Sequence, residues 1–294
     1  MKGYFSHFSA AMLWDIPYIE AVLSNIAEET ESTHITVSGH NARFRNNGKK
    51  VHSCQPALPS GAVIMRNGSS VASPELLFLE LASKLSMHQL ILLGLQLCSH
   101  PSGNHAMAIT TKQKLRAFLA RASGHRGHRK ALRAARYVEN GSASIMESLV
   151  YMTLTLPYVL GGYGLNGVLL NHEIKLNTEA HVNLGQDCCF ADLYYKQAKL
   201  AVEYESFAFH SSPSEQGKDM VRSAVLERQG INVMHLSTIQ LYDRDAFRVF
   251  AKNLAVRLGK RIAIRTEKFD EMHTQLRALL PARKTVPEPK NGRA

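Results

Sequence analysis

The sequence predicts an α/β protein whose second half runs helix, three strands, helix, strand, helix, preceded by a small α+β domain. Phe190 to Lys196 and Lys199 to Ser206 are apolar and aromatic runs joined by a short turn, as in a β-hairpin. Ser214 to Gln229 has helical apolar spacing, Gly230 ends it, and Ile231 to Leu236 is a buried strand. Apolar residues make up 45% of the chain, which is typical of a folded domain.

Further helix and strand signals complete the second half. Ser144 and Glu147 have the S-x-x-E spacing of a capping box, so they begin its first helix. Val168 to Ile174 is a strand that follows a glycine-rich turn, and Asp243 caps the last helix. On the helix from Ser214 to Gln229 we expect three side chains to face inward: Val221, Ala224 and Val225.

The register of the hairpin decides where its acidic residues lie. With the turn at Gln197-Ala198, Asp192 lies opposite Glu203, and alternation puts both on one face with Glu205. A shift of one residue in the pairing would separate them. Directly opposed like charges destabilise a sheet, and a hard divalent cation would offset the repulsion because Mg²⁺ binds carboxylate oxygens.

These acids open an ordered series that continues with His210, Asp219, Arg222 and Gly230. Over residues 142–259 the series resembles the very-short-patch-repair-endonuclease-like domains of the PD-(D/E)XK nuclease superfamily. The resemblance implies a restriction-endonuclease-like core and hydrolysis of DNA phosphodiester bonds. It also implies that Asp192 and Glu203 hold Mg²⁺ or Mn²⁺.

The sequence departs from this family at two points. Glu205-Ser206 stands where the family has Asp-Gly, and Phe190 stands where a basic residue often precedes the first Asp. A glutamate keeps the charge but lengthens the side chain, which weakens the catalytic interpretation more than the fold.

The remaining candidates carry two interpretations each. Glu147 either caps its own helix or, as the resemblance implies, also lies near the metal. His210 is a general acid or base, or a loop histidine without a role. Glu205 is a further ligand or orients the water. Arg222 pairs with Asp219 one helical turn away, or contacts a phosphate.

The first half has short strands followed by apolar helices. Strands are expected at Thr33–Val37, Val51–Ser53 and Ala62–Met65, a helix from Ser73-Pro74-Glu75, and a buried helix over Met87–Cys98. With the motif Ser6-His7-x-Ser9-Ala10-Ala11, this half resembles the C-terminal portion of AbiE-type antitoxins, which are regulators in type IV toxin–antitoxin systems. That resemblance carries over no catalytic residue, and we expect the family's preceding winged helix to be missing.

A basic stretch joins the two halves. Nine Lys and Arg residues and no acids lie between Lys112 and Arg136, in a chain of formal net charge +11. They form either a solvated helix face or a patch that contacts phosphates, and their unbalanced number favours the patch. The residues expected to contact DNA phosphates are Arg126, Arg129, Lys130, Arg133 and Arg222.

The expected organisation is a domain at 1–110, a basic connector at 111–141, a nuclease-like domain at 142–265 and a disordered tail at 281–294. No apolar run is long enough to span a membrane, and four cysteines without C-x-x-C spacing predict a reduced, cytoplasmic protein. Two functions stay open: a metal-dependent DNA endonuclease, or a non-catalytic DNA-binding regulator that keeps a degenerate nuclease fold.

Overall fold

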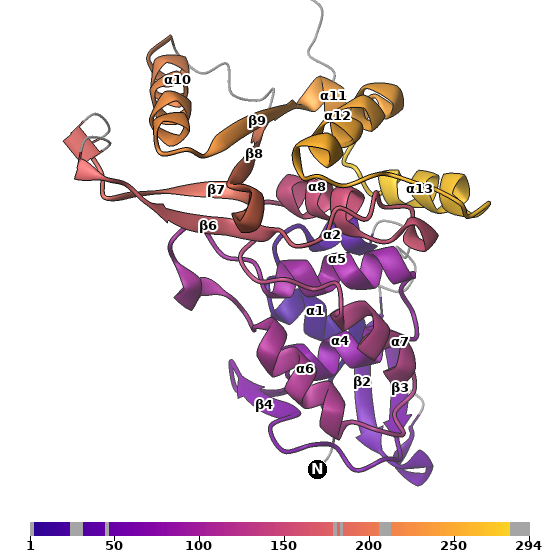
Figure 1. The fold of residues 1–294 in the computed structure, drawn as a ribbon. Coiled ribbons are helices and arrows are strands. Elements are labelled where there is room, and N and C mark those ends of the chain that lie inside the picture. The colour runs from indigo at the N-terminus through magenta and orange to yellow at the C-terminus, as the bar shows by residue number, and fades with distance from the viewer. Residues whose placement is uncertain are drawn as a thin grey trace, which may run out of the picture.

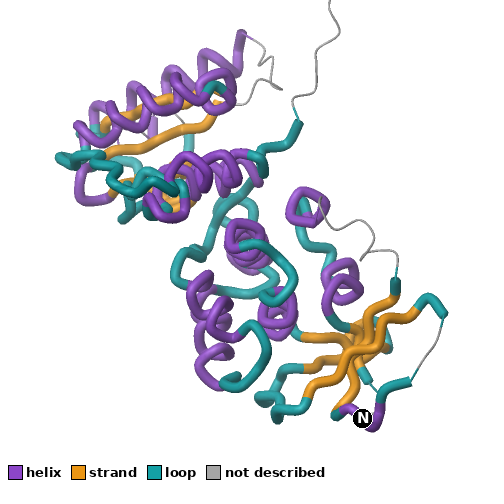
Figure 2. The backbone as a smooth tube through the Cα atoms, turned by 90° about the vertical axis from the view of Figure 1, so that its right-hand side faces the viewer, coloured by secondary structure: helices purple, strands orange, loops and turns teal. Residues whose placement is uncertain are grey.

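The computed structural model describes residues 3–23, 32–44, 47–178, 181–182, 185–205 and 213–282, with the backbone alone at 213–220. The protein belongs to the α/β class and contains two mixed sheets. Figure 2 shows these sheets at opposite ends of the molecule, with helices between them.

The first sheet lies at the N-terminal end and has the order β3-β2-β1-β5-β4. The strands expected near residues 33, 51 and 62 are present, and two short strands that were not predicted, β1 and β5, lie between β2 and β4. Pairing is parallel between β2 and β3 and between β1 and β5, and antiparallel elsewhere. The strands are β1 (Tyr4–Phe5), β2 (Thr33–Ser38), β3 (Lys49–Cys54), β4 (Val63–Arg66) and β5 (Ser69–Ala72).

A layer of helices packs on this sheet (Figure 1). Ser73 caps α4 and Pro74 is its first residue, as predicted. The buried helix α5 is also confirmed, and Ser86 and Gln89 form a capping box at its start. The helices of this layer are α1 (His7–Leu13), α2 (Ile19–Leu23), α4 (Pro74–Leu81), α5 (Met87–Leu97), α6 (Lys112–Arg121) and α7 (His128–Ala135).

The basic stretch forms α6 and α7, and both helices belong to this layer. Leu115, Phe118 and Leu119 of α6 are buried, as are Ala131 and Ala134 of α7. They pack against α4 and α5 and against each other. The segment predicted to be a connector thus contributes apolar side chains to the main core.

The second sheet has the order β6-β7-β8-β9 and lies at the other end of the molecule. Its first three strands are antiparallel, whereas β8 and β9 are parallel. The pairs Leu193–Val202 and Tyr195–Leu200 confirm the predicted hairpin register. The turn is a single 3₁₀ turn, and Lys199 completes it with φ 46°. The strands are β6 (Leu169–Lys175), β7 (Cys188–Tyr195), β8 (Leu200–Glu205) and β9 (Asn232–Ser237).

The helices around this sheet are partly as expected. Asp243 caps α12 through a bond from the Ala246 amide at 2.7 Å, as predicted. Of the three inward residues predicted for α10, Val225 is buried as expected, whereas Val221 and Ala224 are exposed and Leu226 is buried instead. A final helix, α13, was not expected. These helices are α10 (Pro213–Arg228), α11 (Thr238–Tyr242), α12 (Arg244–Arg257) and α13 (Phe269–Arg277).

Helix α8 (Ile145–Thr155) joins the two ends of the molecule. It contacts α5 on one side and β7 and α13 on the other, and it is buried nearly all round. One apolar cluster therefore runs without interruption from Tyr4 to Leu279. The order α8, β6, β7, β8, α10, β9, α12 is the predicted order of the second half.

One predicted catalytic residue and most of the predicted tail fall on other parts of the chain. His210 lies outside the described residues, as do residues 283–294 of the predicted tail. Within the described ranges, the helices are all too short or too polar to cross a bilayer.

Candidate functional site

A row of polar residues crosses the second sheet at the level of the hairpin acids. Continuing the pairs of β7 and β8 puts Asp192 opposite Glu203, and Glu203 pairs with His235 of β9. On the other side, the pairs flanking Asn171 of β6 put it opposite Asp192. Asn171 has φ 43°, an unusual conformation for a strand residue, which turns its side chain away from the regular ladder.

Glu147 reaches this row from the first turn of α8. The Ser144 hydroxyl accepts a bond from the Glu147 amide at 3.1 Å, which caps the helix. Glu147 Oε2 accepts bonds from the Ala143 amide at 2.9 Å and from Asn171 Nδ2 at 2.6 Å. Glu147 therefore serves the helix start, as the capping interpretation predicts, and also lies among the acids of the sheet.

The three carboxyl groups of Glu147, Asp192 and Glu203 oppose one another's ionisation. Burial raises the pKa of each, and the charge of Asp192 further raises the pKa values of Glu147 and Glu203. A backbone bond from the Tyr204 amide to Asp192 Oδ2, at 2.8 Å, partly offsets the shift of Asp192. Asp192 keeps some access to solvent, so the cluster has an open side.

Among the described residues, Arg222 is the cationic side chain that contacts this cluster. Arg222 of α10 donates to Glu203 Oε2 and, at 3.3 Å, to the Phe190 carbonyl. The predicted partner Asp219 has its side chain outside the described residues. Glu203 Oε1 is fully buried and has no hydrogen-bond partner within the described part of the chain. A buried carboxylate oxygen in this state is costly unless something else binds it.

Glu205 points to a different partner. Its side chain is 58% exposed and forms an ion pair with His235 Nδ1 at 2.8 Å. By alternation it shares a face with Glu203, as predicted, but it lies at the end of β8. The third acid of the cluster is therefore Glu147 rather than Glu205. The supporting residues Asn171 and His235 escaped sequence analysis, because neither belongs to a motif.

The predicted phosphate-binding residues divide into two groups. Arg126, Arg129 and Arg133 are exposed. The ammonium group of Lys130 instead donates to the carbonyl of Leu85, and burial lowers the pKa of this lysine. Lys130 thus ties α7 to the loop between α4 and α5, a role that sequence reasoning did not assign to it.

The carboxylate cluster suits a hard divalent cation by its chemistry. All its donors are oxygens, which Mg²⁺ and Mn²⁺ prefer, and Glu203 Oε1 has no partner among the described groups. A cation bound there would relieve the repulsion that raises the three pKa values.

Comparison with models of protein families, with curated proteins and with solved structures gives no match to this chain.

Proposed function

We propose that the protein is a Mg²⁺- or Mn²⁺-dependent DNA endonuclease with a restriction-endonuclease-like core. Asp192 and Glu203 would hold the ion, with Glu147 beside them. The observation that carries this proposal is the buried Glu203 Oε1, which has no hydrogen-bond partner among the described residues and lies next to two further carboxyl groups with raised pKa values.

The side chains around the cluster have separable roles in this proposal. The Tyr204 amide orients Asp192, and Asn171 orients Glu147. When bound, the ion would supply positive charge for the phosphate and lower the pKa of a water molecule. Arg222 neutralises part of the charge of Glu203 and leaves its second oxygen available. Arg126, Arg129 and Arg133 are exposed, and in this proposal they contact DNA backbone phosphates.

One observation favours a second function, that of a DNA-binding regulator without catalysis. Arg222 already neutralises Glu203, and Glu205 is engaged by His235. In a degenerate site, such internal ion pairs could replace the metal. The basic surface would then bind DNA while the sheet serves as a scaffold.

Cleavage assays with a matched pair of variants separate the two functions. The full chain is incubated with supercoiled plasmid in Mg²⁺, Mn²⁺ or EDTA, beside Asp192→Asn and Asp187→Asn. Asp187 is an acid on the same hairpin segment with a side chain that is 95% exposed, so its variant is the control. We expect metal-dependent nicking by wild type and Asp187→Asn, and at least about a 100-fold loss in Asp192→Asn.

Calorimetry of the same three proteins completes the test. Heat of Mg²⁺ or Mn²⁺ binding should appear in wild type and Asp187→Asn and disappear in Asp192→Asn. DNA binding without cleavage and without metal heat in wild type would favour the regulator and rule out the nuclease.

A further inference from the structure

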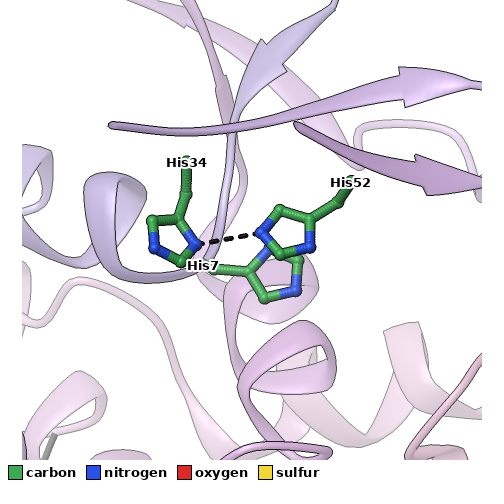
Figure 3. Close-up of side chains that lie close together, drawn as sticks. All are labelled: His7, His34 and His52. Atoms are coloured by element: carbon green, nitrogen blue, oxygen red, sulfur yellow. Dashed lines mark hydrogen bonds between the residues drawn. The ribbon is translucent and has the colours of Figure 1, made fainter. Parts of the chain in front are cut away.

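Three histidines that are far apart in the sequence meet at the edge of the first sheet (Figure 3). His7 begins α1, His34 lies on β2 and His52 lies on the neighbouring strand β3. Each offers a ring nitrogen, and the three nitrogens all lie within 4.8 Å of one another. His34 Nδ1 and His52 Nε2 are 2.9 Å apart, and the rings of His7 and His52 stack at 3.9 Å between centroids.

The spacing of the His34 and His52 nitrogens is close to that of a metal site. Two nitrogens bound to one tetrahedral Zn²⁺ at about 2.0–2.1 Å would lie about 3.3 Å apart. The observed pair at 2.9 Å reaches that separation with a shift of a few tenths of an ångström. Because β2 and β3 are hydrogen-bonded neighbours, the backbone already holds His34 and His52 together.

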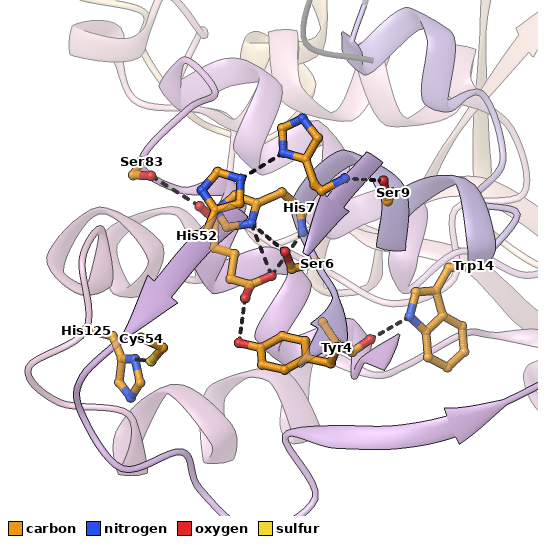
Figure 4. Close-up of polar contacts among 12 residues, drawn as sticks. Tyr4, Ser6, His7, Ser9, Trp14, His52, Cys54, Ser83 and His125 are labelled. Carbon is orange, nitrogen blue, oxygen red and sulfur yellow. Dashed lines mark hydrogen bonds and ion pairs between the residues drawn. The ribbon is translucent and has the colours of Figure 1, made fainter. Parts of the chain in front are cut away.

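The surroundings of His7 are those of a metal-binding imidazole. His7 Nδ1 lies 3.1 Å from the Ser6 hydroxyl and 3.7 Å from Glu80 Oε2 (Figure 4), which leaves Nε2 as its candidate ligand atom. Glu80 also accepts bonds from the His7 amide at 3.0 Å and from the Tyr4 hydroxyl at 2.9 Å. Glu80 therefore fixes the backbone of His7, and the Ser6 hydroxyl is the hydrogen-bond partner of its ring at Nδ1.

Two further properties favour a cation here. His7 has φ 49°, a strained conformation for a side-chain-bearing residue, and such strain is concentrated at functional positions. His7 also interacts electrostatically with two ammonium groups, those of Lys50 and Lys84. Lys50 and Lys84 oppose a cation, whereas the nearly buried carboxyl group of Glu80 favours one.

We propose that His7, His34 and His52 form a binding site for a Zn²⁺-class divalent transition metal ion. Three nitrogen ligands leave a fourth position open for water or an anion, as in catalytic rather than structural zinc sites. Imidazole ligands select Zn²⁺, Cu²⁺ or Ni²⁺ over Mg²⁺, so this site differs in metal class from the carboxylate cluster. It is independent of the proposed nuclease activity.

Metal titration of the EDTA-treated full chain tests the proposal. We expect one Zn²⁺ to bind per chain, and saturation to raise the melting temperature by about 5 °C or more. Co²⁺ should give the visible absorption of a tetrahedral site, and one equivalent of Zn²⁺ should abolish it. Wild type without the Co²⁺ spectrum and without Zn²⁺ heat would overturn the proposal, whatever the variants do.

Variants then assign the ligands. His52 is the most exposed of the three, so His52→Ala is the mildest change. Loss of an outer partner alone costs about 10–100-fold in affinity, so this variant should lose at least about 100-fold. His52→Cys supplies a thiolate and should restore binding.

Two controls exclude other sites on the chain. His40 is an exposed histidine close to the first sheet, and His40→Ala should bind Zn²⁺ like wild type. Asp192→Asn should also retain Zn²⁺, because the carboxylate cluster lies in the other sheet. Undiminished binding by His52→Ala, or loss of binding in Asp192→Asn, would contradict the proposed ligands.

Discussion

At the scale of single residues, the two oxygens of Glu203 have unequal surroundings. Oε2 receives the guanidinium of Arg222, whereas Oε1 is buried beside Asp192 and Glu147 without a hydrogen-bond donor among the described residues. Arg222 is thus the sole described cation that offsets the charge of the cluster. Removing it would therefore measure how far its guanidinium reduces the repulsion among the three carboxyl groups.

Replacing Arg222 by Met should destabilise the metal-free protein by about 2 kcal/mol, because it leaves a buried carboxylate unpaired. The same change should enlarge the rise in melting temperature caused by Mg²⁺, since a bound ion would then neutralise more charge. Thermal unfolding in EDTA and in Mg²⁺ measures both effects. Arg228→Met, at the end of the same helix, is the matched control. An equal Mg²⁺ response in Arg222→Met and wild type would contradict a cation site at Glu203.

Asp192→Asn should have the opposite effect on the metal-free protein. The amide removes a buried charge that raises the pKa values of Glu147 and Glu203, so we expect a melting temperature at or above that of wild type in EDTA. In Mg²⁺ the order should reverse, because wild type alone gains from binding. Melting curves in the two buffers check this crossover, and parallel shifts would contradict it.

Sequence reasoning reached part of this site. The alternation of apolar and acidic residues in the hairpin predicted the pairing register of its two strands, and this register places Asp192 opposite Glu203. The contact of Asn171 with Glu147 could not be predicted, because it depends on a φ of 43° at Asn171 and no residue pattern indicates such a backbone conformation. His34 and His52 were missed because their meeting depends on parallel pairing of two short polar strands.

At the scale of elements, a 3₁₀ turn, η3 (Tyr158–Leu160), is held by two histidines. His88 of α5 bonds the carbonyl of Leu160 through Nε2 at 2.9 Å, and His273 of α13 bonds that of Gly161 through Nδ1 at 2.7 Å. Both bonds require a ring N–H directed at a carbonyl. Burial lowers the pKa of both rings, and His273 Nε2 is buried without a partner in the described part of the chain.

These two histidines predict acid sensitivity. In the unfolded chain a histidine has a pKa of about 6.5, and the folded values lie lower, so protons bind preferentially to the unfolded state. Their contribution to stability is complete above pH 6.5 and declines as the pH falls below it. Melting temperatures between pH 7.5 and 5 measure this loss.

Asparagine at 273 and glutamine at 88 preserve the donor positions without titrating. The double variant His88→Gln/His273→Asn should therefore reduce the acid loss between pH 6.5 and 5, whereas the exposed control His40→Asn should not. The remaining loss includes the part of His7, whose pKa burial also lowers. A double variant that keeps the full acid loss would show that other groups cause it.

Gly161 allows α13 to pack closely against the η3 turn, because it has no side chain. Its φ is 76°, and a Cβ there would lie 2.4 Å from the backbone nitrogen of His273. Gly161→Ala should thus destabilise the protein by about 3 kcal/mol, through strain and displacement of α13. Gly167 has φ 90° and open space around it, so Gly167→Ala should cost only about 1 kcal/mol. Chemical denaturation compares the two, and equal losses would argue against the close packing of α13.

Elements with strong local signals were predictable, and others were not. Ser73, Ser144 and Asp243 cap helices as expected, because their side chains satisfy free amides at the helix start. Helix α13 lacks such a signal, since Lys268 provides no side-chain cap. The inward face of α10 was only partly predicted: Val225 is buried as expected, but Leu226, which packs with Ile231 and the sheet, takes the place expected for Val221 and Ala224.

At the scale of the whole molecule, the exposed arginines of the loop between α6 and α7 and of α7 itself should govern any affinity for DNA. Arg126→Gln/Arg129→Gln/Arg133→Gln should weaken binding to all sequences and lower the slope of log K against log salt by up to about 2.7, at about 0.9 for each phosphate contact. Lys130 is left unchanged because it ties α7 to Leu85. Titrations at several salt concentrations measure the slope, and an unchanged slope would mean that this surface is only solvated.

The sequence did not indicate that one apolar core joins its two halves. Charge marked residues 111–141 as a connector, whereas the apolar faces of α6 and α7 place them in the core. Amphipathic helices give the same pattern whether they link domains or cover one, so tertiary packing alone decides between these roles.

The burial of α8 on all sides has a consequence for descent. Helix α8 packs against α5 on one side and against β7 and α13 on the other. A recombinant that received only one of these two sides from another protein would keep a fitting contact with α8 on one side and a poorly fitting contact on the other. Gln96 and Ser148 share a buried hydrogen bond of 2.9 Å across one of these boundaries, so even the polar contacts are paired between layers. The two halves are therefore expected to be inherited together, with substitutions on α8 tracking those on α5 and β7.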